Sequence, residues 1–394
     1  MSSPREFLLG PWRAVPVLGI TQILAWGTIF YTPVLMLPLI AAERGFSLTF
    51  AMGGFSVGLL AAGFVSPAIG RLIDRHGGHR VMPFGSLGGA LGLAALAYAS
   101  HPAAYLAVWI LLGAALAASL YDPAFATLGR IFGANARSPI TALTLIGGFA
   151  STVSWPVTYL LLQSAGWKAT YLIYAAALAL IAAPLHAFAL PRDRAEIRIK
   201  PADGSLPPPP TRPATGAAFL LVVAAFASYA FVPSGLSAHL LAIFQRAGID
   251  PGTVVVIGAL FGPSQVAARL CEFIFARNVH PLWIARFAVG LLVASFALLG
   301  LFGLSTPVAV VFAIMFGVAN GLITIARGAV PLALFGAAGY GGIIGRIAGP
   351  ALIVTAVAPV VIAFVAERAS DPAALGVATA FAALAFICFV AIRR

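Results

Sequence analysis

The stretch "GRLIDRHGGHR", residues 70–80, gathers charge between two long apolar runs. It packs five side chains that can carry positive charge, and the single carboxylate of Asp74, into eleven positions. Each flanking run is long enough to cross a bilayer as a helix, which takes about 20 predominantly apolar residues. The stretch is therefore predicted to be a polar loop at one membrane surface.

The composition supports this prediction. Hydrophobic residues make up 61% of the 394 residues and charged residues only 9%, which leaves too little polar surface for a soluble globule. Lipid offers no water to backbone groups and the alternation of a membrane barrel is absent, so the apolar runs must be helices. An all-α membrane protein is predicted, with twelve transmembrane helices at residues 14–39, 48–72, 81–100, 104–128, 139–163, 169–190, 216–243, 253–276, 284–304, 307–327, 342–365 and 373–391.

The distribution of basic residues predicts the orientation. The start of the chain, "MSSPREFLLGPWR", offers no small-residue cleavage site, so we expect the first span to stay in place. With both termini in the cytoplasm, the outer loops keep only Arg44, Lys168, Arg246 and Arg368, which satisfies the positive-inside rule. The net charge of +12 therefore reflects topology in the cell membrane, and we expect no nucleic-acid partner.

A polar, proline-rich segment divides the chain. Residues 191–213, "PRDRAEIRIKPADGSLPPPPTRP", are predicted to be a cytoplasmic linker between an N-terminal six-helix bundle, 1–190, and a C-terminal six-helix bundle, 214–394. An offset of about 204 residues aligns glycines of the two halves, placing Gly54, Gly58 and Gly113 on Gly258, Gly262 and Gly317. A shared offset indicates a duplication. Parallel repeats of this kind place a substrate path at their interface.

The opening stretch resembles the loop signature of the major facilitator superfamily, through Gly70, Leu72, Asp74, Arg75, Gly77 and Arg80. The match lies between the second and third of twelve spans, where the signature belongs, although Gly78 and His79 replace the usual basic residues. The resemblance implies alternating access, in which two pseudo-symmetric bundles rock around a central site. It also implies a solute and the bilayer as partners, and we expect a monomer.

The resemblance implies a latch that closes the inner side. It directs Asp74 at the cytoplasmic start of span 11, where the positive end of a helix and Arg346 offer partners. Gly70 would permit close helix approach. The alternative is a loop that only fixes topology. The predicted gating residues are Gly70, Asp74, Arg75, Gly77, Arg327 and Arg346.

Span 8 carries three polar side chains on one helix face, namely Gln265, Arg269 and Glu272. Ionisable groups in lipid are costly, so each is a candidate for function. The guanidinium could bind a carboxylate through paired N–H donors, while the glutamate could exchange protons or neutralise Arg269 when the site is empty. The alternative is an internal Arg269–Glu272 pair, a relic of the loop signature, because "RLID" at 71–74 recurs as "RLCE" at 269–272.

Opposite charges occupy equivalent places in spans 4 and 10. Asp122 and Arg327 lie 205 residues apart, so they could pair and close the inner side of a cavity. Protonation of Asp122 would weaken the pair and couple protons to movement. The alternative is a static salt bridge at a helix end. Pro123 is expected to kink this helix.

The resemblance assigns the cavity lining to spans 1, 4, 7 and 10. There the chain offers Gln22, Trp26, Tyr31, Tyr121, Ser228, Tyr229, His239 and Asn320. Trp and Tyr serve equally as membrane-interface anchors, and His239 could be a satisfied polar residue. As substrate-binding residues they would suit a small, partly apolar substrate.

Enzyme functions are not supported. The sequence lacks a phosphate-cradling glycine loop, zinc-ligand spacing and a gathered Ser, His and Asp trio. Cys271 and Cys388 both fall in predicted spans, so we expect no disulfide, metal or cofactor.

The sequence favours a proton-coupled secondary transporter of a small organic anion. It is loosely similar to the monocarboxylate-porter branch in its span-8 arginine and glycine-rich span 11. The alternative is proton-driven efflux of drugs or toxic metalloid compounds, although "LIGGFASTVSWP" in span 5 lacks the Gly-Pro pair of such antiporters. A membrane receptor or scaffold is the alternative outside transport.

Overall fold

The structure is a computed structural model that describes residues 10–192, 214–237, 239–276 and 278–393. Of the predicted linker, 191–213, the structure describes Pro191 and Arg192, and residues 193–213 lie outside the described ranges. Throughout the described ranges the regular structure is helical, which confirms the predicted fold class.

The N-terminal half begins with the helical turn η1 (Pro11–Arg13). Its longer elements are α2 (Ala14–Ala25), η2 (Trp26–Tyr31), α3 (Pro33–Arg44), α4 (Leu48–His76), α5 (Gly78–Tyr98), α6 (Pro102–Ser119), α7 (Tyr121–Phe132), α8 (Arg137–Gly147), α9 (Ala150–Ala177), η4 (Leu178–Ala182) and η5 (Leu185–Ala189). The C-terminal half comprises α10 (Gly216–Ser237), α11 (Leu240–Arg246), α12 (Pro251–Phe275), α13 (Pro281–Phe302), α14 (Thr306–Phe335), α15 (Tyr340–Arg368) and α16 (Asp371–Ala391).

The predicted twelve crossings are present. Eleven segments of the described chain are long and apolar enough to span a membrane. One of them, Arg137–Ala189, is 53 residues long and turns back at Gly166, whose φ of 75° lies outside the helical region. It therefore supplies two crossings. Span 10, expected to end at residue 327, continues to Phe335, so Arg327 lies inside a helix rather than at its end.

The two halves pack in the same pattern. The helix pairs α4–α6, α5–α6, α2–α8 and α5–α9 recur as α12–α14, α13–α14, α10–α15 and α13–α16. A Cβ on Gly113 would overlap the carbonyl oxygen of Gly58, and one on Gly317 would lie 2.9 Å from that of Phe261. Small residues thus let equivalent helices approach closely in both halves, which supports the duplication at an offset near 204.

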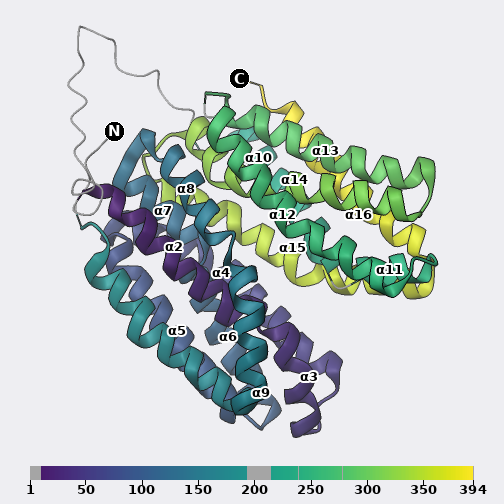
Figure 1. The fold of residues 1–394 in the computed structure, drawn as a ribbon. Coiled ribbons are helices and arrows are strands. Elements are labelled where there is room, and N and C mark those ends of the chain that lie inside the picture. The colour runs from purple at the N-terminus through teal and green to yellow at the C-terminus, as the bar shows by residue number, and fades with distance from the viewer. Residues whose placement is uncertain (1–9, 193–213, 238, 277, 394) are drawn as a thin grey trace, which may run out of the picture.

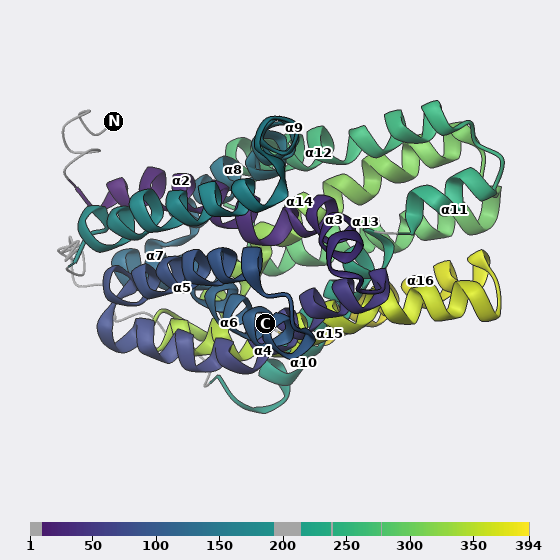
Figure 2. The ribbon, with the colours of Figure 1, turned by 90° about the horizontal axis from the view of Figure 1, so that it is seen from below.

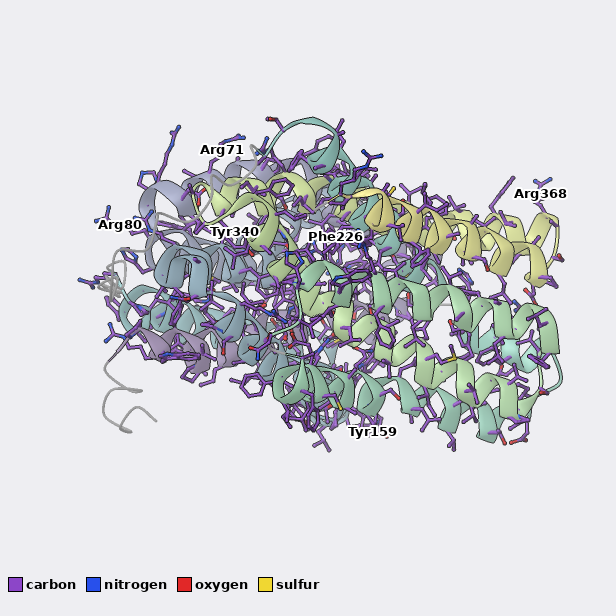
Figure 3. All side chains as sticks on the ribbon, turned by 90° about the horizontal axis from the view of Figure 1, so that it is seen from above. Arg71, Arg80, Tyr159, Phe226, Tyr340 and Arg368 are labelled. Atoms are coloured by element: carbon purple, nitrogen blue, oxygen red, sulfur yellow. The ribbon has the colours of Figure 1, made fainter. Side chains whose placement is uncertain are left out.

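The halves meet at one end of the molecule and diverge toward the other (Figure 1). Arg71 and Arg80 lie at the first end and Arg368 at the opposite end (Figure 3); we call these the linker end and the far end. Contacts between the halves come from α4, α7 and α8 on one side and from α12, α14 and α15 on the other. Seen from below, the two groups of helices lie side by side (Figure 2).

Two membrane-spanning helices are interrupted near the place where the halves meet. Span 1 passes from α2 into the π-helical segment η2, and such segments are frequent at functional sites. Span 4 breaks at Leu120, where ψ is −160°, and restarts as α7. The side-chain amide of Gln22 donates to the carbonyl of Ser119 at 2.7 Å and to that of Leu120, which also accepts from the amide of Ala124, at 3.3 Å. The break thus lies three residues before the expected kink at Pro123.

Candidate functional site

The contact between α4 and α15 is made largely of backbone. Asp74 Oδ1 accepts a hydrogen bond from the amide of Gly341 at 2.8 Å, and Oδ2 accepts one from Gly342 at 2.7 Å. These amides lie in the first turn of α15, at the positive end of the helix. A Cβ on Gly70 would overlap the carbonyl oxygen of Gly341. Asp74 therefore lies at the start of span 11, as predicted.

Arg346 is not the partner of Asp74, which corrects the predicted counter-charge. Its guanidinium lies over the ring of Phe219, with Cζ 4.6 Å from the ring centroid, and its Nε is 3.4 Å from the carbonyl of Gly342. Among the other predicted gating residues, Arg75 is exposed. Gly77 turns the chain between α4 and α5 with a φ of 82°, and the gating role of the set stays a prediction.

Asp122 and Arg327 form an ion pair across the halves. Arg327 Nε and Nη2 donate to the two carboxylate oxygens of Asp122, at 2.9 and 2.8 Å. Asp122 is in the first turn of α7 because span 4 restarts one residue earlier, and Arg327 is in the interior of α14. The pairing predicted from the 205-residue offset is therefore present. The side chains are 16% and 28% exposed, so water can reach this pair.

Glu272 also pairs across the halves, with a residue that the sequence prediction missed. The Nη2 of Arg137, at the start of α8, donates to Glu272 Oε1 at 2.9 Å, and Thr141 Oγ1 donates to Oε2 at 3.3 Å. Arg137 also donates to the carbonyls of Ala276 and Val279. Glu272 is 3% exposed. An internal pair with Arg269 is therefore not the arrangement of this conformation.

Arg269 is a buried guanidinium that contacts only neutral oxygens. It is 5% exposed and donates to the carbonyl of Thr144 at 3.0 Å. Longer contacts of 3.4 to 3.5 Å reach Gly321 O, Gln265 Oε1 and Thr324 Oγ1. None of the ion pairs found in the described ranges includes Arg269. Its positive charge therefore has no carboxylate partner there.

Tyrosines from both halves lie near this charge. The Arg269 guanidinium lies within electrostatic range of the hydroxyl groups of Tyr31, Tyr121 and Tyr229. The ring centroid of Trp26 lies 5.3 Å from that of Tyr121 and 5.9 Å from that of Tyr31. Three of the predicted aromatic residues therefore lie near Arg269, and Trp26 packs against two of them.

Comparisons with known proteins agree with this architecture. The model of the family described as "Major Facilitator Superfamily" matches residues 17–326. The chain belongs to the major facilitator superfamily. No curated protein sequence matches the chain.

Solved structures of other members of the superfamily share the fold. The human organic anion transporter MFSD10 (TETRAN) has a TM-score of 0.71 at 17% identity, covering 98% of this chain and 100% of its own. The proton:xylose symporter XylE, bound to 6-bromo-6-deoxy-D-glucose, has a TM-score of 0.74 at 10% identity, covering 97% and 96%. FucP in the outward conformation has a TM-score of 0.66 at 13% identity, covering 96% and 99%.

As a member of the major facilitator superfamily, the protein is a secondary transporter in the membrane.

Not every predicted site residue faces Arg269. Gln22 is completely buried, and its amide both fills the break in span 4 and accepts a hydrogen bond from Trp26 Nε1 at 3.1 Å. Gln22 therefore positions the Trp26 side chain through this hydrogen bond and does not itself contact Arg269. Asn320 accepts a hydrogen bond from Tyr229, and Gln265 contacts Arg269 directly.

His239 lies elsewhere, which corrects its place in the predicted site. It directly precedes α11, its Nε2 is 3.3 Å from the carbonyl of Pro359, and it interacts electrostatically with Asp371. Asp371 pairs with Arg246 at the far end of the superfamily fold. His239 therefore belongs to the far end rather than to the residues around Arg269.

Proposed function

We propose that the protein transports a small organic anion and that Arg269 binds it. The observation that carries this proposal is the buried guanidinium without a carboxylate partner. A buried charge is strongly unfavourable unless it is paired, so an anionic solute is the natural partner of this site. A planar carboxylate suits the guanidinium because it can accept two parallel N–H bonds.

The surroundings of Arg269 support a substrate with an apolar part. Ring faces and hydroxyl groups are offered near Arg269 by Tyr31, Tyr121 and Tyr229. A further ring face is offered by Trp26, which packs against the first two tyrosines. Sites of this composition bind a small body by contact and orient it through a few polar groups. A loosely monocarboxylate-porter-like substrate range is part of this proposal, supported by Arg269 in span 8 and the glycines of span 11.

We further propose that protons drive the transport. Asp122 and Glu272 are the acidic side chains at the described contacts of α7 and α8 with α14 and α12. Asp122 is the stronger candidate, since its pair with Arg327 is partly exposed and protonation would weaken the attraction between the halves.

The proposal includes an orientation. Basic residues dominate the linker end, so we place both termini and residues 191–213 in the cytoplasm. The conformation described would then be closed toward the cytoplasm. Residues 1–190 and 214–394 would rock as two bodies around Arg269. The orientation is tested by labelling single cysteines, placed at residue 44 or 80, from outside the cell. We expect labelling at residue 44 alone.

The anion site is tested by thermal unfolding of the purified protein with sodium acetate, pyruvate or benzoate, with amino acids and with cationic drugs. We expect at least one carboxylate to raise the Tm of the wild type by several degrees, because a ligand at 100 times its Kd stabilises by about 2.7 kcal/mol. Arg269→Gln should abolish this rise. The matched control is Arg246→Gln, which removes a far-end arginine paired with Asp371 and should leave the rise intact. Stabilisation by cationic drugs alone would contradict the proposal and favour efflux.

A further inference from the structure

Arg269 and Glu272 lie one turn apart on α12, and both reach across to α8. Arg269 donates to the carbonyl of Thr144, and Glu272 accepts from Thr141 and Arg137. Side chains three residues apart on a helix are neighbours on its surface. The first two turns of α8 therefore contact two opposite charges that lie one turn apart on α12, and each charge has a different partner there.

These contacts cannot survive opening of the linker end. The helix α8 belongs to the N-terminal half and α12 to the C-terminal half, and the two halves of a transporter of this superfamily must separate there in the other conformation. Glu272 would then lose Arg137 and Thr141 together. Glu272, which is 3% exposed in the closed conformation, would lose its cation, and oppositely charged side chains three residues apart on a helix stabilise each other.

On α12 and the two helices packed against it in the C-terminal half, Arg269 is the described arginine without a carboxylate partner. The helices packed against α12 within this half are α14 and α11. Arg327 of α14 is held by Asp122, and Arg246 of α11 is held by Asp371 at the far end. Arg269 is on the same helix face as Glu272 and has no carboxylate partner.

We propose that Glu272 exchanges Arg137 for Arg269 when the linker end opens, and so acts as an internal anion that displaces the substrate. With the linker end closed, Arg137 holds Glu272 away and leaves Arg269 free to bind a solute from the far end. With the linker end open, Glu272 neutralises Arg269 and the solute leaves. Arg137 is thus a positioning residue. The displacement step rests on the proposed anion site, whereas the exchange of partners does not.

The exchange is tested without a substrate by electron–electron distance measurements on the full chain in lipid nanodiscs. Spin labels are attached at Ala134→Cys and Ala338→Cys, two exposed positions that precede α8 and α15, with Cys271→Ser and Cys388→Ala. All samples carry Gly70→Ala, which pushes α4 from α15 and brings both conformations into measurable range. The ratio of linker-end-open to linker-end-closed protein is the readout.

The two arginines should act in opposite directions. Arg137→Gln removes the partner of Glu272 in the closed state and should raise the ratio about tenfold, while Arg269→Gln removes it in the open state and should lower the ratio about tenfold. The part of each shift that depends on Glu272 is obtained by repeating both substitutions with Glu272→Gln present, since Arg137→Gln then loses only its bonds to Ala276 and Val279 and Arg269→Gln only its bonds to neutral oxygens such as Thr144 O. We expect the Glu272-dependent parts to have opposite signs and to be at least threefold each.

Glu272-dependent shifts of the same sign would overturn the exchange, and so would shifts that are unchanged by Glu272→Gln. A merely structural arginine would destabilise the protein without this dependence on Glu272. If the partner exchange holds but no carboxylate stabilises the protein in the thermal screen, the proposed anion site fails alone.

Discussion

Two contacts between the halves, α4 with α15 and α8 with α12, join pseudo-equivalent helices in different ways. In the first, an acid near the end of span 2 bonds to backbone amides at the start of span 11, and glycines bring the helices together. In the second, an acid near the end of span 8 bonds to Arg137 and Thr141 at the start of span 5. The motifs "RLID" and "RLCE" thus place an acid near the end of each span, although they lie 198 rather than about 204 residues apart.

The two contacts differ in the kind of hydrogen-bond partner that each acid requires. Asp74 is satisfied by amides that any helix start provides, so the α4–α15 contact depends on close approach and shape. Glu272 is satisfied by a particular side chain on the other half, so the α8–α12 contact depends on charge. The first contact is suited to closing the linker end, and the second to sensing whether it is closed.

The largest effect is expected from adding one methyl group to the α4–α15 contact. In Gly70→Ala the new Cβ would overlap the backbone carbonyl of Gly341, which cannot move aside alone. Overpacking of this kind costs about 1–3 kcal/mol, here against the closed linker end. We expect uptake into proteoliposomes to fall at least tenfold, with an increased open population in the distance measurements.

The matched control for this substitution is Gly376→Ala. Gly376 is also helical, but a Cβ there meets nothing within 4 Å, so transport should stay near the wild-type rate. Equal loss in both variants would show that shape at the α4–α15 contact is not what matters.

An intermediate effect is expected from Asp122→Asn. The contact of Asp122 with Arg327, like that of Glu272 with Arg137, depends on charge. The amide keeps the shape but loses the charge that pairs with Arg327, and it cannot bind the coupled proton. We expect uptake to stop responding to an imposed pH gradient, while exchange of labelled for unlabelled substrate continues. Uptake that still follows the gradient would assign the proton to another group.

The smallest effect is expected from Asp74→Asn. One amide-to-oxygen bond to α15 can remain, but the negative charge at the helix start is lost, a change of about 1 kcal/mol. Uptake should slow about fivefold with little change in KM, since Asp74 does not touch the proposed site. Asp250→Asn is the control, because Asp250 caps its own helix at Thr253; an equal slowing there would contradict the latch.

The fold could be predicted almost entirely from sequence because lipid leaves few alternatives. The length of the apolar runs predicted the spans, and the motif at residues 70–80 predicted the family. Asp122 and Arg327 were predictable as a pair because each is a rare charge inside a span and their offset matches the repeat. The amide partners of Asp74 were predictable only as a helix start, since backbone groups leave no residue signature.

Other parts of the site could not be predicted. Arg137 looked like one of many inner loop cations under the positive-inside rule, and its contact with Glu272 spans 135 residues. The helix break at Leu120 also lacked a signal at its own position, although Gln22, a buried amide, is what makes the break tolerable. His239 was misplaced because span 7 ends at Ser237 and a separate helix, α11, follows.

The unpaired guanidinium also has an electrical consequence. At the contacts of α7 and α8 with α14 and α12, Asp122 pairs with Arg327 and Glu272 with Arg137, so Arg269 leaves one uncompensated positive charge at these contacts when no solute is bound. A bound monoanion removes that charge. The proton proposed to load Asp122 restores one positive charge, so the empty and loaded forms carry the same charge at these contacts. Because moving one elementary charge through the membrane field is worth about 2.3 kcal/mol per 100 mV, voltage should act about equally on the loaded step and on the return of the unloaded carrier.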